Sequence, residues 1–210
     1  MSVFNDDFRK ALRDLFVMRR DVRRFRRDPV PEGTFERLAE LANLAPSVGL
    51  SQPWRFVIVD DTRRRRAVRD VFQAENEAAQ RDYADERAAL YASLKLAGLD
   101  EAPVQFAVFA DRNTVQGGGL GRRTMPEMAE YSAVAAVHTL WLAARAEGLG
   151  LGWISILDPS TMAATLDVPA GWIFIGYFCL GYPATEEATP ELERAGWEQR
   201  RPARDFITRR

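Results

Sequence analysis

Cysteine and histidine are almost absent from this 210-residue chain, which holds one of each, Cys179 and His138. A single cysteine excludes an internal disulfide and is typical of a reducing compartment. One histidine without a cysteine cluster cannot build the usual zinc site, and it argues against a Ser-His-Asp or Cys-His hydrolase. We therefore expect no metal site. We interpret His138 as a packed helix residue and Cys179 as an inert strand residue.

The chain also lacks an excess of charge of either sign and a long apolar run. Its 29 Lys and Arg residues nearly cancel its 30 Asp and Glu residues. A nucleic-acid-binding protein needs a net or clustered positive surface, so we expect no such partner. No charge-free apolar run reaches the roughly 18 residues of a membrane span, and the N-terminus carries no apolar signal region. With 47% hydrophobic residues, the composition predicts a cytoplasmic globular protein without membrane contact.

Apolar periodicity predicts helices and strands that alternate along one domain, residues 1–210, of mixed α and β class. A first helix carries Phe8, Leu12, Leu15 and Phe16, and a second begins at Pro31 with Phe35, Leu38 and Leu41 facing inward. Further helices are expected over residues 62–96, 124–148 and 159–166, and strands over 56–59, 104–110, 151–157 and 172–180. The tail, residues 183–210, is polar and irregular.

The predicted 124–148 helix has two features of its own. Thr124 and Glu127 match a capping box, with Pro126 in the first turn. The helix is apolar nearly all round, which predicts a central place in the core.

Three conspicuous segments resemble known binding motifs but lack the features that those motifs need. The glycines of segment 148–152 follow a helix and precede a strand, whereas a dinucleotide fingerprint needs the reverse order. Segment 117–124 lacks the lysine of a P-loop. Arg63 to Arg66 point in different directions on a helix, which favours a solvated face.

Two segments are candidates for binding a polar ligand. Segment 45–56 joins a helix to a strand through two prolines, and it is either a ligand-binding loop or an ordinary connection. Segment 19–23 places Asp21 among arginines that could grip a phosphate bidentately. We expect those arginines to lower the pKa of Asp21. The alternative for this segment is a surface ion-pair cluster.

The order of these segments resembles the FMN-dependent nitroreductase superfamily, from about residue 18 to residue 200. Finer motifs are similar to its 5,6-dimethylbenzimidazole synthase subfamily. These are Arg-Arg-Asp-Val-Arg-Arg-Phe from Arg19, Ala-Pro-Ser-Val-Gly-x-x-Gln-Pro-Trp from Ala45, Gly-Arg-x-Thr-Met-Pro-Glu from Gly121, and Gly-Leu-Gly-Trp-Ile-Ser-Ile-Leu-Asp-Pro from Gly150.

This resemblance implies a fold and an activity. The fold is α+β, with a mixed, largely antiparallel central sheet flanked by helices, in an interlocked homodimer that holds FMN at its interface. Enzymes of this subfamily fragment reduced FMN with dioxygen into 5,6-dimethylbenzimidazole, the lower ligand of vitamin B12, and erythrose 4-phosphate. FMN is then a consumed substrate, supplied as FMNH2 by a separate flavin reductase.

The resemblance also implies roles for individual residues. Asp21 matches an acid/base near the ribityl chain, and Ser155 matches a serine that hydrogen-bonds the flavin ring. Residues 75–100 correspond to a lid-like helical insertion, and residues 183–210 form a C-terminal extension. The remaining flavin contacts are expected from Arg19, Arg20, Val22, Arg23, Ser93, Lys95 and Arg200, and from Pro46, Ser47 and Val48 of the partner subunit.

Two other functions remain open at this point. One is an NAD(P)H-dependent nitroreductase or flavin reductase that recycles FMN, and the other is a flavin-binding protein without catalysis. Asp21 and Ser155 favour the synthase, because hydride transfer through the flavin ring needs no acid/base beside the ribityl chain.

Overall fold

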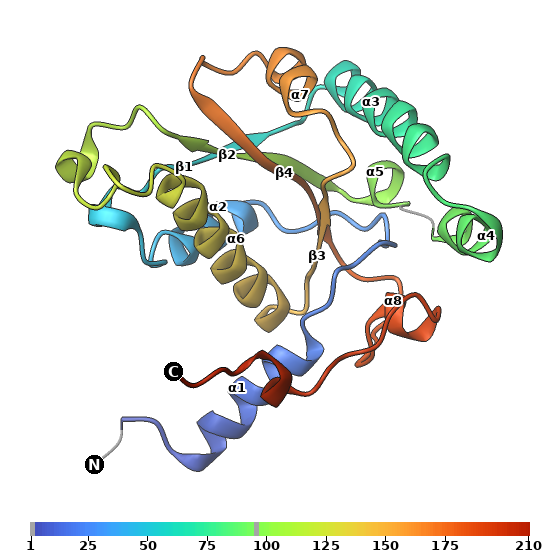
Figure 1. The fold of residues 1–210 in the computed structure, drawn as a ribbon, viewed down its shortest axis with the longest axis horizontal. Coiled ribbons are helices and arrows are strands. Elements are labelled where there is room, and N and C mark those ends of the chain that lie inside the picture. Colours follow the sequence, from blue (N-terminus) through green and yellow to red (C-terminus); the bar gives the residue numbers. More distant parts are fainter. Residues whose placement is uncertain (1–2, 95–96) are drawn as a thin grey trace.

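The chain folds around one four-stranded sheet in the computed structural model, which describes residues 3–94 and 97–210 (Figure 1). The strands are β1 (Trp54–Ile58), β2 (Val104–Asp111), β3 (Gly150–Ile154) and β4 (Trp172–Gly181), in the order β1-β2-β4-β3. All three pairings are antiparallel, and a single bridge between Asp21 and Leu151 is parallel. The predicted α+β fold with a largely antiparallel sheet is therefore confirmed.

Strand β2 is buried on both faces, as its continuous apolar sequence predicts. Phe106 and Val108 point into one hydrophobic cluster, and Ala107 and Phe109 point into another on the opposite face. This alternation follows the two-residue period of a strand. The sheet thus separates two layers of core.

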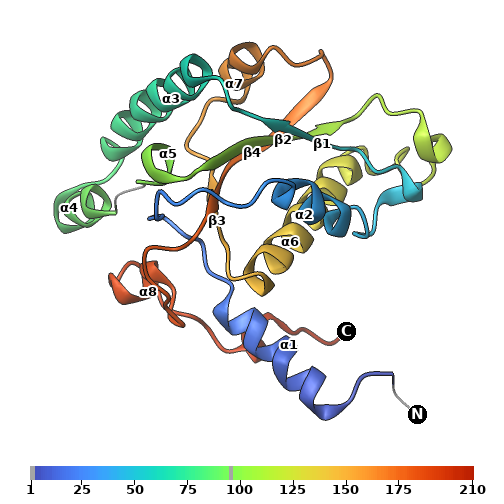
Figure 2. The ribbon, with the colours of Figure 1, turned by 180° about the vertical axis from the view of Figure 1, so that it is seen from behind.

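Helices cover each face of the sheet (Figures 1 and 2). Helices α2 (Thr34–Ala42) and α6 (Met128–Ala146) pack on one face, and α3 (Thr62–Gln80), α5 (Gly98–Glu101) and α7 (Pro159–Leu166) lie on the other. Leu38 and Leu140 are fully buried in the first layer, and Val68 and Met162 in the second. Among the described residues, none of the helices combines the length and apolarity that crossing a membrane requires.

Helix α6 differs from its prediction at its start and on one face. It begins at Met128, and Glu127 makes no side-chain capping bond, so the predicted capping box is wrong. One face is buried through Ala133, Val137 and Leu140, but His138 is exposed, so its predicted packing is also wrong. The helix stops as predicted at Gly148, whose φ of 77° lets Leu149 N–H reach the Ala144 carbonyl at 2.9 Å in a Schellman motif.

Other boundaries also shift from the predictions. Helix α2 begins at Thr34 rather than Pro31, after Gly33 in the left-handed region, and Leu41 is exposed rather than inward. The predicted 62–96 helix is two helices, because α3 ends at Gln80 and α4 (Asp85–Ser93) follows a short turn. Strand β3 ends at Ile154 and leaves segment 155–157 irregular.

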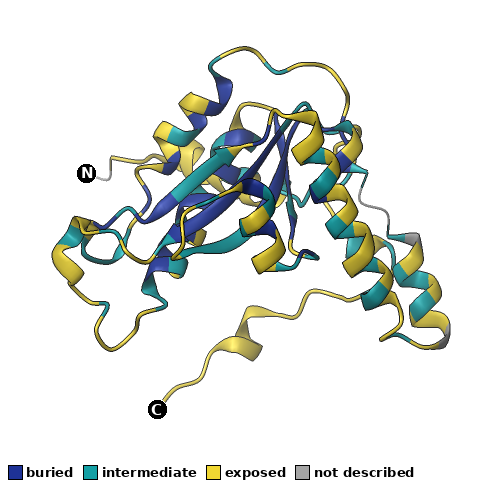
Figure 3. Cartoon of the chain, turned by 90° about the horizontal axis from the view of Figure 1, so that it is seen from above, coloured by how far each residue is buried: buried dark blue, intermediate teal, exposed yellow. Residues whose placement is uncertain are grey.

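Both terminal segments lie outside the core. Helix α1 (Asp6–Met18), capped by Asn5, has no buried residue, and its predicted apolar positions Phe8 and Phe16 are exposed. The tail contains only α8 (Glu191–Arg194) and a 3-10 turn at Ala203–Phe206. Figure 3 shows the last part of this tail exposed along its length.

Candidate functional site

The basic segment 19–24 lies against the edge of the sheet at β3. Val22 N–H donates to the Leu151 carbonyl at 3.0 Å, and Trp153 N–H donates to Asp21 Oδ1 at 2.8 Å. Further on, Arg26 N–H donates to the Tyr182 carbonyl at 2.9 Å. These bonds extend the sheet and fix the segment in place. We call residues 19–24 the basic turn.

Two glycines of β3 permit this close approach. Gly150 and Gly152 point to the same side of the strand, toward Val22. A Cβ on Gly150 would lie 2.6 Å from Val22 Cγ2, and a Cβ on Gly152 would overlap the Val22 carbonyl oxygen. The glycine run that resembles a dinucleotide fingerprint therefore has a packing role, because it makes room for the basic turn.

The environment of Asp21 is less favourable to charge than the sequence suggests. Its side chain is 37% exposed, and its Oδ2 atom lies 3.7 Å from Arg23 Nε. Burial raises the pKa of Asp21, although the Trp153 N–H bond and the charges of Arg23 and Arg19 act in the opposite direction. The predicted lowering of this pKa is therefore wrong: loss of hydration outweighs the neighbouring arginines. A raised pKa makes the carboxylate a stronger base than an exposed aspartate.

The arginines of the basic turn form a cluster with Arg200 of the tail. The Arg19 guanidinium lies 4.9 Å from the centre of the Trp141 ring, and Arg20 Nε donates to the Ala188 carbonyl at 2.9 Å. Burial, followed by the charge of Arg200, lowers the pKa of both Arg19 and Arg20. Asp21 and Glu193 offset this repulsion only in part. The structure thus brings Arg200 to the two arginines with which the sequence analysis grouped it.

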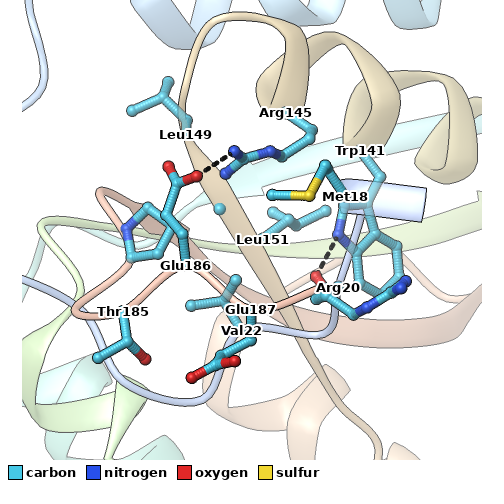
Figure 4. Close-up of a pocket in the computed structure, with 12 residues that line it drawn as sticks. Met18, Arg20, Val22, Trp141, Arg145, Leu149, Leu151, Thr185, Glu186 and Glu187 are labelled. Atoms are coloured by element: carbon cyan, nitrogen blue, oxygen red, sulfur yellow. Dashed lines mark hydrogen bonds and ion pairs between the residues drawn. The ribbon is translucent and has the colours of Figure 1, made fainter. Parts of the chain in front are cut away.

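An open cleft lies beside Arg20, the member of this cluster that lines it. It has a volume of about 310 Å³ and is lined by Arg20, Val22 and Arg23 together with tail residues between 185 and 194. A smaller cavity of about 20 Å³ lies beside it, with Trp141 Nε1 donating to the Arg20 carbonyl at 3.1 Å and Arg145 paired with Glu186 (Figure 4). That cavity has room for about one water molecule. The cleft, by contrast, falls within the usual size of small-molecule sites.

Hydrogen bonds and packing contacts hold the loop that contains Pro46, Ser47 and Val48 in a defined conformation. Val48 N–H donates to Ser132 Oγ at 3.1 Å, and Gln52 N–H donates to Ser47 Oγ at 3.1 Å. Leu50 and Gln52 adopt left-handed conformations with φ of 53° and 42°, which cost energy in non-glycine residues. The loop also packs against segment 116–121, where a Cβ on Gly121 would lie 2.8 Å from Val48 Cγ2.

Helix α6 holds this loop and the basic turn apart within one chain. Ser132 in its first turns binds Val48, and Trp141 near its other end binds Arg20. These two anchor positions are about 14 Å apart along the helix axis, since an α-helix rises ~1.5 Å per residue. The two predicted halves of the flavin site are therefore anchored at separate positions along α6 in a single chain.

Ser155 lines a cleft that does not include Asp21. It is exposed one residue beyond the end of β3, in a cleft of about 430 Å³ that also includes Glu75 of α3 and Asp82 of the turn before α4. Strand β3 nevertheless links the two residues, because Trp153 binds Asp21 and lies two positions before Ser155. Of the predicted lid contacts, Ser93 ends α4 with a side chain that the structure does not describe, and Lys95 lies outside the described residues.

Two tryptophans that support the site were not among the predicted site residues. Trp141 stacks under Arg19 and binds the Arg20 carbonyl, and Trp153 provides the N–H bonded to Asp21. A lone tryptophan in the alanine-rich stretch of α6 was a signal for the first. Trp153 stands in one of the quoted motifs. Its hydrogen bond to Asp21 comes from the backbone N–H, however, and the identity of a side chain does not predict a backbone hydrogen bond of this kind.

Comparisons with known proteins identify the class of protein that this fold and site define. The chain belongs to the nitroreductase family, whose family model matches residues 17–182. It is similar to a 5,6-dimethylbenzimidazole synthase of Rhodospirillum rubrum, with 58% identity over 95% of each chain. A 5,6-dimethylbenzimidazole synthase of Rhodobacter capsulatus is 46% identical over 95% of this chain and 96% of its own length. The predicted resemblance to this subfamily is therefore confirmed.

A solved structure supports the fold assignment. Oxidized iodotyrosine deiodinase, bound to FMN and 3-iodo-L-tyrosine, superposes on this chain with a TM-score of 0.71 at 25% sequence identity. The match covers 84% of this chain and 91% of the deiodinase chain.

The close approach at β3 predicts that Gly152→Ala destabilises the protein. The new methyl group meets the Val22 carbonyl, so the basic turn must move, and overpacking of this kind typically costs about 1–3 kcal/mol. Urea denaturation measures the loss. If Gly152→Ala unfolded with the same urea midpoint as the wild type, the packing role of Gly152 would be contradicted.

Proposed function

We propose that this protein is a 5,6-dimethylbenzimidazole synthase, which fragments FMNH2 with dioxygen and releases 5,6-dimethylbenzimidazole and erythrose 4-phosphate. One observation carries the proposal: Asp21 is bonded onto β3 with a raised pKa, beside an arginine cluster suited to a phosphate. The 58% identity to the Rhodospirillum rubrum synthase supports it. FMN is then a substrate that is consumed rather than a cofactor that returns.

The donor set of the arginine cluster fits the phosphate of FMN. After burial, the charge of Arg200 lowers the pKa of both Arg19 and Arg20, and the charges of Asp21 and Glu193 offset this effect only in part. A phosphate dianion would supply the missing negative charge, and guanidinium groups bind phosphate oxygens bidentately. In this assignment Arg23 and Val22 line the cleft toward the ribityl chain.

The remaining residues would act on the flavin ring and on its protons. The reduced ring supplies the electrons that dioxygen accepts. Asp21 accepts or donates a proton near the ribityl chain, and Ser155 hydrogen-bonds a ring heteroatom through a hydroxyl that can donate or accept. In this proposal α4 and the turn before it act as a lid over the site. Water is thereby excluded from the reaction.

We infer that the functional unit is a homodimer. As the family resemblance implies, Pro46, Ser47 and Val48 reach the flavin from the partner subunit, and in their own chain α6 anchors their loop apart from the basic turn. The single chain also exposes apolar surface: Phe8, Leu12 and Met18 of α1 line a groove of about 450 Å³ with Ala146, and α6 exposes Tyr131 and Val134. Burial of such surface favours a two-fold interface.

The 1–210 domain, with residues 183–210 as a C-terminal extension, would act in the cytoplasm with FMNH2 from a separate reductase.

The fate of the flavin tests the proposed function. FMNH2 mixed with the protein without oxygen and then exposed to air should yield 5,6-dimethylbenzimidazole, detected by chromatography, with a matching loss of recoverable FMN. The pure protein should oxidise NADH and NADPH negligibly. Rapid nucleotide oxidation with complete recovery of FMN would instead establish an NAD(P)H-dependent nitroreductase or flavin reductase. Tight binding of flavin without either reaction would indicate a non-catalytic flavin-binding protein.

Arg19→Ala should weaken the binding of FMN but not that of riboflavin, because only FMN carries the phosphate. Loss of a hydrogen bond to a charged group costs about 1.5–3 kcal/mol, roughly a 10- to 100-fold change in affinity. Fluorescence quenching measures both dissociation constants. Arg27→Ala, which removes an exposed arginine outside the arginine cluster, is the control and should leave both unchanged. Equal weakening for the two flavins would show that Arg19 does not bind the phosphate.

Asp21→Asn should retain FMNH2 binding and lose product formation. The amide keeps the size and accepts the Trp153 N–H bond but cannot act as a base, and general acid–base catalysis typically contributes about 10²–10⁴-fold in rate. Ser155→Ala should also bind flavin and lose yield, less completely. Product formation at the wild-type rate in Asp21→Asn would make Asp21 a structural residue only.

The pH dependence gives a second check on Asp21. Burial raises the pKa of this carboxyl, so its basic form is lost on acidification at a higher pH than the ~3.9 of a free aspartate. The rate of product formation in the wild type should fall through that window as the pH decreases. The residual rate of Asp21→Asn should lack this fall. Burial disfavours the ionised form of Asp21 in the folded protein. The free energy of unfolding of Asp21→Asn at neutral pH should therefore be no lower than that of the wild type.

A further inference from the structure

Three aromatic rings join α4 to the C-terminal tail. Tyr83 and Tyr91 stack with their centroids 5.0 Å apart, and Trp197 of the tail meets Tyr83 edge-on at 5.5 Å. The Arg87 guanidinium covers the Trp197 ring at 4.8 Å from its centre. Tyr91 also donates to Asn76 Oδ1 of α3 at 2.9 Å. The tail is thus attached to the predicted lid through Trp197. We call Tyr83, Arg87, Tyr91 and Trp197 the aromatic latch.

The backbone around α8 fixes the position of Trp197. Gly196 has a φ of 77°, and the N–H of Trp197 donates to the Leu192 carbonyl at 2.8 Å while the N–H of Gly196 donates to the Glu193 carbonyl at 3.2 Å. This is a Schellman motif, which determines where the chain leaves a helix. The half-buried Trp197 ring therefore enters the latch from a defined backbone rather than from a free tail.

Arg200 follows Trp197 after three residues, a span of at most about 10 Å. Its guanidinium lies near those of Arg19 and Arg20, as its effect on their pKa values shows. Arg200 itself is exposed, and its segment has little packing of its own. Two fixed points precede it: Gln199, whose Nε2 donates to the Glu193 carbonyl of α8 at 3.4 Å, and Trp197, the one of the two that packs against α4.

We propose that Trp197 is a positioning residue that couples the α4 segment to phosphate binding, because it holds Arg200 at the arginine cluster and α4 against the tail at the same time. This inference rests on the proposed function, since it takes the bound phosphate to be that of FMN. Binding of that phosphate by Arg200 would order the tail and, through the latch, close α4. Removal of the latch would loosen both.

The test combines a double-mutant cycle with proteolysis of α4. Dissociation constants for FMN and riboflavin are measured in wild type, Trp197→Ala, Arg200→Ala and the double variant. An edge-on aromatic contact corresponds to roughly 3- to 10-fold in an equilibrium, so Trp197→Ala should weaken FMN by about that factor and leave riboflavin unchanged. In the Arg200→Ala background the same substitution should have no further effect on FMN. Trp197→Phe, which keeps an aromatic ring, should restore most of the affinity.

Trypsin reports on α4 directly, through cleavage after Arg81 and Arg87. Cleavage should be faster in flavin-free Trp197→Ala than in wild type, and FMN should protect α4 in wild type but not in Trp197→Ala or Arg200→Ala. Phe206→Ala is the matched control, because it removes another tail aromatic under an arginine, Arg201, without touching α4. It should behave as wild type.

The possible failures differ from one another. Fully additive effects of Trp197→Ala and Arg200→Ala on FMN affinity would overturn the coupling. Unchanged cleavage of flavin-free Trp197→Ala would overturn the latch itself, whatever the flavin affinities are. A wild-type protein that binds neither flavin would refute the proposed function and the coupling with it, while the cleavage of the flavin-free variants would still report on the latch.

Discussion

The candidate site depends on one close contact, the approach of the basic turn to strand β3. Gly150 and Gly152 leave the space that Val22 occupies, and the N–H of Trp153 binds Asp21 in the gap. Without that contact, the arginines would be an exposed and self-repelling cluster on a mobile connection. With it, Asp21 is partly desolvated and its pKa is raised, while Arg19 is stacked on Trp141. Sheet packing therefore sets both the position and the protonation of the group proposed to move protons.

Helix α6 imposes the second constraint, because it is a rigid spacer between two parts of the proposed site. Its first turns hold the loop of Pro46, Ser47 and Val48, and its last turns hold the basic turn. An α-helix neither bends nor shortens enough to bring such anchors together. In the proposed homodimer, a flavin contacted by both parts lies between two chains. The exposed apolar residues of α1 and α6 are consistent with that arrangement.

Much of the fold could be predicted from the sequence, because β2 is a continuous apolar run and α6 is rich in apolar residues up to a clear stop signal at Gly148. The start of α6 was missed because Thr124 and Glu127 match a capping box locally while the chain around Gly117 to Gly121 packs against the Val48 loop. Leu41 and His138 were placed inward because a periodic pattern cannot tell a core face from a face left open in one chain.

The sequence could suggest which residues belong to the site, but not what surrounds them or how those surroundings shift their pKa values. The direction of the Asp21 pKa depends on desolvation by segments far away in the sequence, which residue types do not reveal. The cluster of Arg200 with Arg19 followed from resemblance, and the support from Trp141 and Trp153 came only with the structure.

The central claim is that each site combines the basic turn of one chain with the Pro46 loop of another, and a mixed dimer tests it most directly. Asp21→Asn and Pro46→Glu, each expected to be inactive alone, are unfolded together, refolded and assayed for 5,6-dimethylbenzimidazole. In a two-fold dimer with shared sites, half of the sites in every mixed dimer carry neither substitution, so about a quarter of the wild-type activity should return. If the mixture stays as inactive as its components, both segments act within one chain and the shared site is wrong.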